Sequence, residues 1–334
     1  MHLSVGKREG LQAVSDARGV IAALAIDQRD ALRALFAVEM KVEKSAVPAN
    51  CLEQFKSIVV GTLSLHASAA LLEPEYGLDA AARRDPSCGL LMAYEVSGYD
   101  RHVPGRLPKL LENWSVRRLV DSAGADGIKV LLYYALSDAP DIQQRKRDWV
   151  QRVGEECAAY DVPFFLEIVP YQDGLNEKSP EFARCKPAIL TSAMQEFSKD
   201  QFGVDVLKVG VPVTMAYVQG SSVYEGTAVH TRLEALDLFR RTADVTAKPF
   251  LFLSAGVSNK AFTEALNLAS QAGAPFCGVL CGRATWKDGV GVFVRDGAGA
   301  LREWVETKGV ENIRSINACL KGATPLWERC SANA

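Results

Sequence analysis

The chain has 334 residues, of which 48% are hydrophobic, 23% charged and 8% aromatic, a balance typical of a globular protein with a large core. Its formal net charge is −2, and the Lys and Arg residues are spread along the chain, which argues against nucleic acid or a polybasic membrane surface as a partner. The sequence has no run of about 18 apolar residues, and residues 1–19 lack the apolar core of a signal peptide, so we expect no membrane span and a cytoplasmic location.

Eight short apolar runs, each typical of a buried parallel strand, recur along the chain. They lie at 20–27, 69–74, 89–95, 127–134, 162–170, 204–212, 249–256 and 277–284, with helix-like stretches at 51–70, 141–160, 231–245 and 259–273. Repeated strand and helix signals without a linker predict an α/β fold, a single (β/α)₈ TIM barrel over residues 1–334 with a short N-terminal helix and a C-terminal helical extension. A doubly wound open sheet is the alternative, and the strand count argues against it.

Polar or special residues stand at or near the C-terminal end of every predicted strand, where a barrel builds its active site. They are Asp27, Glu73, Glu95, Lys129, Glu167, Lys208, Ser254 and the pair Gly282 and Arg283. For Glu73 and Glu95, capping of the following helix is an equally good interpretation. A capping or rim role explains the three charges inside strands, Lys129, Glu167 and Lys208, much less well.

Lys129, Glu167 and Lys208 fall on the fourth, fifth and sixth predicted strands. Neighbouring strands lie roughly 4.8 Å apart, so at one level Glu167 would lie between two lysines about 10 Å apart. A purely structural buried network is the alternative, but such networks stabilise less than apolar packing and coupled buried charges often mark sites. The set suits Schiff-base chemistry, with Lys208 as the amine and Glu167 as the proton carrier. Burial and the Lys129 cation would favour the neutral amine of Lys208.

Two glycine-containing loops, 253–258 and 280–285, follow the seventh and eighth strands, where barrels commonly bind phosphate through backbone N–H groups. Simple strand-to-helix turns are the alternative. The candidate ligands of an anionic substrate are Ser254, Gly256, Gly282 and Arg283 on these loops, and Asp27, Gln28 and Arg29 after the first strand. The histidines at 2, 66, 102 and 230 have no ligand spacing, so we expect no metal site.

The segments 25–33, 73–78, 127–134, 163–168, 205–209, 252–258 and 278–286 together resemble the class I tagatose 1,6-bisphosphate aldolases, over nearly the whole chain. The resemblance implies a (β/α)₈ barrel, no metal or cofactor, a dimer or tetramer, and cleavage of a ketohexose 1,6-bisphosphate to dihydroxyacetone phosphate and glyceraldehyde 3-phosphate. It assigns Lys208 as the Schiff-base lysine and Glu167 as the acid and base. Lys129 and residues 27–29 match substrate contacts, and Ser254, Gly256, Gly282 and Arg283 match the site of the ketone-side phosphate.

One departure from the family pattern concerns the far end of the substrate. Relatives usually carry Lys-Val-Glu-x-Pro, whereas residues 208–212 read Lys-Val-Gly-Val-Pro, so Gly210 removes a carboxylate from the face of the strand that carries Lys208. We expect Arg283 to bind the ketone-side phosphate and Arg29 the distal anion. A sulfofructose 1-phosphate or other ketose-phosphate aldolase, and a sugar-phosphate-binding regulator without turnover, are the alternatives.

Overall fold

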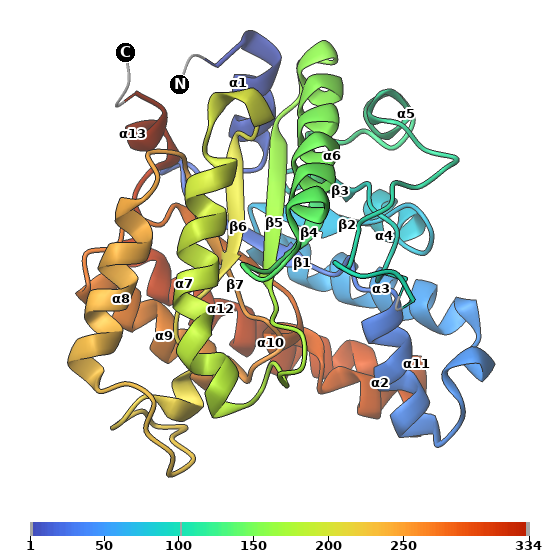
Figure 1. Ribbon diagram of the computed structural model, residues 1–334. Coiled ribbons are helices and arrows are strands. Elements are labelled where there is room, and N and C mark those ends of the chain that lie inside the picture. Colours follow the sequence, from blue (N-terminus) through green and yellow to red (C-terminus); the bar gives the residue numbers. More distant parts are fainter. Residues whose placement is uncertain (1–2, 101, 332–334) are drawn as a thin grey trace.

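The computed structural model describes residues 3–100 and 102–331, so His2 lies outside the described residues. Eight parallel strands form a closed barrel in chain order (Figure 1). They are β1 (Ile21–Ala25), β2 (Ala69–Leu72), β3 (Gly89–Ala93), β4 (Gly127–Tyr134), β5 (Phe164–Pro170), β6 (Val206–Gly210), β7 (Phe250–Leu253) and β8 (Gly278–Cys281). β8 pairs with β1 from Ile21 opposite Gly278 onward. The predicted (β/α)₈ barrel is confirmed, and the open-sheet alternative is excluded.

Helices surround the barrel (Figure 1). The principal ones are α2 (Asp30–Met40), α3 (Ala49–Leu63), α4 (Leu78–Ala82), α5 (Val116–Asp121), α6 (Pro140–Ala159), α7 (Pro180–Phe197), α8 (Arg232–Asp244), α9 (Asn259–Gln271), α10 (Arg283–Trp286), α11 (Gly289–Trp304) and α12 (Val310–Ala318). The predicted helices at 141–160, 231–245 and 259–273 correspond to α6, α8 and α9. The prediction at 51–70 was too long, because α3 ends at Leu63 and a short 3₁₀ turn leads into β2.

Two apolar clusters result from the alternation of side chains along the strands. The larger cluster lies between the strands and the helices, and the smaller fills the barrel with residues such as Leu71, Phe165 and Leu251. Leu11 of α1 (Val5–Ala13) and Leu326 of α13 (Leu326–Ser331) join the inner cluster, and both helices lie at the same end of the molecule (Figure 1). They close one end of the barrel, which leaves the other end for a site. None of the helices in the described residues is long and apolar enough to cross a bilayer.

Glu73, which follows β2, has a structural role. Its carboxylate forms a fully buried ion pair with Lys56 of α3. Its other oxygen accepts hydrogen bonds from the backbone N–H groups of Glu75 at 2.7 Å and Tyr76 at 3.0 Å. These contacts anchor the turn before α4, which favours the capping interpretation of Glu73 over a chemical one.

Candidate active site

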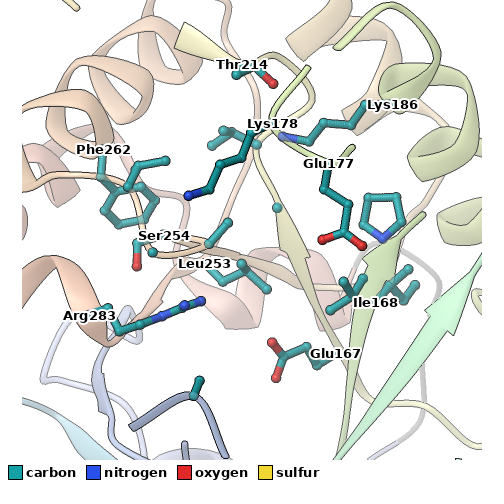
Figure 2. A pocket seen from close by; sticks show the side chains of 18 of the residues that line it. Glu167, Ile168, Glu177, Lys178, Lys186, Thr214, Leu253, Ser254, Phe262 and Arg283 are labelled. Atoms are coloured by element: carbon teal, nitrogen blue, oxygen red, sulfur yellow. The ribbon is translucent and has the colours of Figure 1, made fainter. Parts of the chain in front are cut away.

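A pocket of about 820 Å³ opens at the end of the barrel where β4, β5 and β7 reach their last residues (Figure 2). Eight of the ten predicted site residues line it: Asp27, Gln28, Arg29, Lys129, Glu167, Ser254, Gly256 and Arg283. Lys208 is only 2% exposed and contacts the lining residue Glu167 from below. Gly282 lies against β1, where an added Cβ would come within 2.5 Å of the Ala25 carbonyl oxygen. Gly282 therefore provides close packing beside the lining residue Gln28.

The floor of the pocket carries the three charges that interrupt the predicted strands. Nζ of Lys208 donates to Oε2 of Glu167 at 2.7 Å, and Nζ of Lys129 lies 2.8 Å from the same oxygen. Glu167 is therefore between the lysines, as expected. The expected single level is wrong for Lys129, because Glu167 pairs with Lys208 in the register of the sheet, whereas Lys129 pairs with Phe165. The long Lys129 side chain reaches up from a deeper position, so both amines converge on one carboxylate oxygen.

Lys129 is surrounded by carboxylates. Its Nζ lies 2.8 Å from Asp27, 2.7 Å from Glu95 and 2.8 Å from Glu167. Burial alone would lower the pKa of Lys129, but Asp27, Glu167 and Glu95 outweigh burial and raise this pKa well above its usual value. Lys129 is thus a permanent cation within the cluster that also holds the Lys208 amine.

The same cluster keeps two of its carboxylates ionised. Burial would raise the pKa values of Asp27 and Glu167, but the Lys129 and Lys208 ammonium groups outweigh burial and lower both. Glu167 is therefore in its proton-accepting form in the ligand-free site, in hydrogen-bond contact with the amine that it would serve.

Glu95 is a member of the site that the sequence analysis did not select. It follows β3, is 5% exposed and binds Lys129. Its position at the end of an apolar run was the available signal, but a helix cap gives the same signal. Only the register of β3 against β4, in which Ala93 lies opposite Lys129, brings the carboxylate to the lysine.

Arg29 lines the pocket with its charge already matched. Its side chain is 5% exposed, with Nη1 2.6 Å from Glu75 and Nη2 3.6 Å from Glu95. Beside it, Nε2 of Gln28 donates to Asp27 at 3.0 Å. The geometry suits the orientation of Glu95 better than the capture of a free anion, and the expected role of Arg29 at the distal anion stays a prediction.

Arg283 has the opposite environment. Gly256 has φ +80°, and a Cβ at this position would lie 2.7 Å from Cζ of Arg283, so the guanidinium covers the Gly256 backbone because that residue is glycine. Figure 2 shows Arg283 extending into the pocket near Ser254. Within the described residues, Arg283 makes no salt bridge. Its unmatched charge and the adjacent loop backbone suit a phosphate.

The described part of the chain contains no group of three or more His, Cys, Asp or Glu side chains arranged to hold a metal ion. What it does contain is a buried amine in contact with an ionised carboxylate, an adjacent fixed cation, and an unpaired arginine above them. These groups can form and protonate a carbinolamine and can bind an anionic substituent near it.

Sequence comparison places the chain among aldolases. Residues 21–288 match the model of the DeoC/LacD family aldolases. The chain is 46% identical to tagatose 1,6-diphosphate aldolase 2 of Streptococcus mutans, with 98% of each chain covered. It is 44% identical to tagatose 1,6-diphosphate aldolase of Staphylococcus aureus, with 98% of this chain and 99% of the other covered.

Structure comparison finds the same fold in distant proteins. An archaeal fructose 1,6-bisphosphate aldolase superposes with a TM-score of 0.52 at 15% identity, covering 90% of this chain and 98% of the other. A Schiff-base-forming fructose-1,6-bisphosphate aldolase gives a TM-score of 0.51 at 17% identity, with the same coverage. At these identities the likeness concerns the fold alone, whereas the sequence matches extend over the whole barrel. The chain belongs to the DeoC/LacD family of aldolases.

Proposed function

We propose that this protein is a class I aldolase that cleaves a ketohexose 1,6-bisphosphate such as D-tagatose 1,6-bisphosphate to dihydroxyacetone phosphate and D-glyceraldehyde 3-phosphate. The observation that carries the proposal is the contact of the Lys208 amine with Glu167 beneath an anion-compatible pocket. The names of the relatives from Streptococcus mutans and Staphylococcus aureus support the substrate.

Schiff-base formation uses Lys208 and Glu167. After Lys208 gives a proton to Glu167 at 2.7 Å, its neutral amine adds to the ketone carbon and forms a carbinolamine. Glu167 then returns the proton to the carbinolamine hydroxyl, which leaves as water, and the C=N bond of the iminium forms. The fixed Lys129 cation at 2.8 Å favours the ionised form of Glu167 and so helps the protonated carboxyl to give its proton back.

Carbon–carbon cleavage uses the iminium as the electron acceptor. When Glu167 removes the proton of the C4 hydroxyl, the C3–C4 bond breaks, its electron pair forms the enamine, and the aldehyde leaves. Protonation of the enamine at C3 and addition of water to the iminium release the ketone product and regenerate the amine. No external oxidant or reductant is needed, because the oxidation states of the fragments balance within the substrate.

Binding of the ketone-side phosphate is assigned to Arg283 with the backbone of Ser254 and Gly256, because the guanidinium lies over this loop and makes no salt bridge in the described part of the chain. Asp27 and Gln28, which line the same pocket, are assigned to sugar hydroxyls. The cytoplasmic location and the homo-oligomer also belong to this proposal, and light scattering of the purified protein tests the oligomer.

The test of the proposed function is covalent trapping. Incubation with dihydroxyacetone phosphate and borohydride should add the mass of the reduced adduct to the peptide that contains Lys208. The Lys208→Met variant provides the matched control and should acquire no adduct. If the wild-type protein is stabilised thermally by the ligand but acquires no adduct, the protein is a sugar-phosphate-binding regulator rather than an aldolase.

A further inference from the structure

We propose that Lys178 and Lys186 form the subsite for the terminal oxyanion, phosphate or sulfonate, at the distal end of the substrate. This inference rests on the proposed aldolase function and adds the residues that select the aldehyde half of the substrate. Lys178 precedes α7 and Lys186 lies within it, and both line the pocket. Figure 2 shows them on its upper side, with Glu167 and Arg283 on the lower side.

The positive charges of the two lysines are not matched by the protein. Within residues 3–100 and 102–331, neither ammonium group has a carboxylate in ion-pair contact. Among the described residues, Nζ of Lys186 makes one hydrogen bond, to the Val213 carbonyl oxygen at 3.4 Å, a distance at the long end for such a bond. This environment contrasts with that of Lys129, which has three carboxylates. Lys186 is half-buried and has no carboxylate partner in the described structure, so an arriving anion would stabilise its charge.

Two carboxylates also line this part of the pocket, and neither neutralises the lysines. Glu177 forms an ion pair with Arg106 at 2.6 Å, and Glu225 is exposed and makes no salt bridge in the described structure. The lysine pair therefore remains the local source of positive charge for a ligand that enters the pocket.

Gly210 provides the space that the anion needs. It lies on the same face of β6 as Lys208, two residues further along the strand, and it lines the pocket. A Cβ built on Gly210 would meet nothing closer than Cε of Lys186, at 4.0 Å. The missing side chain therefore leaves an opening beside Lys186, on the face of the strand that holds the Schiff-base lysine.

The backbone around Lys178 is fixed although its side chain is exposed. The Tyr217 hydroxyl donates to the Lys178 carbonyl oxygen at 2.6 Å. The next residue, Ser179, caps α7 by accepting a hydrogen bond from the Phe182 backbone N–H at 3.2 Å. Because these contacts already fix the backbone, only the side chain of Lys178 loses conformational entropy when it binds an anion.

The reverse reaction, aldol condensation, allows binding at the two ends of the substrate to be measured separately. Dihydroxyacetone phosphate is held constant, and the second substrate is D-glyceraldehyde 3-phosphate, the corresponding aldehyde with a terminal sulfonate, or D-glyceraldehyde without a distal anion. For Lys186→Met and Lys178→Met we expect KM for the preferred anionic aldehyde to rise about 10-fold to 100-fold, the scale of a charge-assisted hydrogen bond, and KM for D-glyceraldehyde to change less than about twofold. The wild-type preference between the two anionic aldehydes identifies the oxyanion.

Matched variants isolate the charge. Lys199→Met, just beyond α7 in an exposed pair with Glu196, should change neither KM. In Gly210→Glu, the new carboxylate should pair with Lys186 and strongly weaken binding of the anionic aldehyde. Gly210→Gln introduces no charge and should weaken this binding less. If Lys186→Met raised KM equally for the charged and the uncharged aldehydes, the proposed subsite would be wrong. It would also be wrong if Arg29→Ala raised KM for the anionic aldehyde alone and Lys186→Met did not. If wild-type protein is not trapped by borohydride, the aldolase proposal itself fails.

Discussion

The floor and the wall of the pocket differ in whether their positively charged side chains are paired with carboxylates. On the floor, Lys129, Lys208 and Arg29 each contact at least one carboxylate. On the wall, Arg283 beside the floor and the lysines at 178 and 186 on the upper side have no carboxylate partner within the described residues. Buried charges that are paired with one another can exchange protons and hold a geometry, and unpaired ones are available to an anionic ligand. In our proposal, this contrast separates the groups that do chemistry from those that bind the phosphate or sulfonate of the substrate.

Replacement of Lys208 should have the largest effect. Lys208→Met removes the amine and should reduce kcat/KM for the bisphosphate by at least about 10⁴-fold, the scale seen when a covalent nucleophile is lost. The measurement is initial-rate kinetics, with a thermal melt to confirm folding. Residual activity within about tenfold of wild type would assign the nucleophile to another residue and break the division between floor and wall.

Glu167→Gln should have the next largest effect, because the amide keeps the size of the carboxylate but cannot accept and release a proton. We expect kcat to fall by about 10²-fold to 10⁴-fold with a smaller change in KM. The rate of adduct formation with borohydride should fall in parallel. A change confined to KM would show that Glu167 only binds substrate, which would contradict its role as a proton carrier.

Arg283→Ala tests the unpaired group nearest to the floor. Loss of its guanidinium should weaken the binding of dihydroxyacetone phosphate about 10-fold to 100-fold, as expected for a charge-assisted contact. The concentration dependence of borohydride trapping measures this affinity. Arg29→Ala is the matched comparison, because it removes an arginine whose charge is already balanced by Glu75 and Glu95. An equal loss of affinity in both variants would remove the distinction between paired and unpaired arginines.

The sequence predicted the barrel and most of the floor for a physical reason. A charge inside an apolar strand is costly, so Lys129, Glu167 and Lys208 were conspicuous. Glu95 was ambiguous, because a carboxylate after a strand is also a good helix cap. Lys178 and Lys186 were not detected, since a lysine near the start of a helix is ordinary in sequence. Their proposed role rests on the absence of carboxylate partners within the described residues and on the opening at Gly210, which only three-dimensional packing shows.

The smallest expected effect is a pH dependence of distal-anion binding. Burial lowers the pKa of Lys186 to about 8, so its positive charge is lost as pH rises through that value, whereas the phosphate of the aldehyde, with a second pKa near 6, is already a dianion. We therefore expect kcat/KM for D-glyceraldehyde 3-phosphate to fall up to about tenfold per pH unit above pH 8, relative to D-glyceraldehyde. Lys186→Met should abolish this relative dependence.

Unfolding would not produce the same profile through Lys186. Its folded pKa of about 8 is below the usual 10.5, so between these pH values the unfolded chain binds more protons and the contribution of Lys186 to stability increases with pH.

The titratable groups facing the same part of the pocket are Glu177, Lys178 and Glu225. Lys178→Met therefore serves as the control, in which the pH dependence should remain. If the relative dependence persisted in Lys186→Met and disappeared in Lys178→Met, the titrating cation of the subsite would be Lys178.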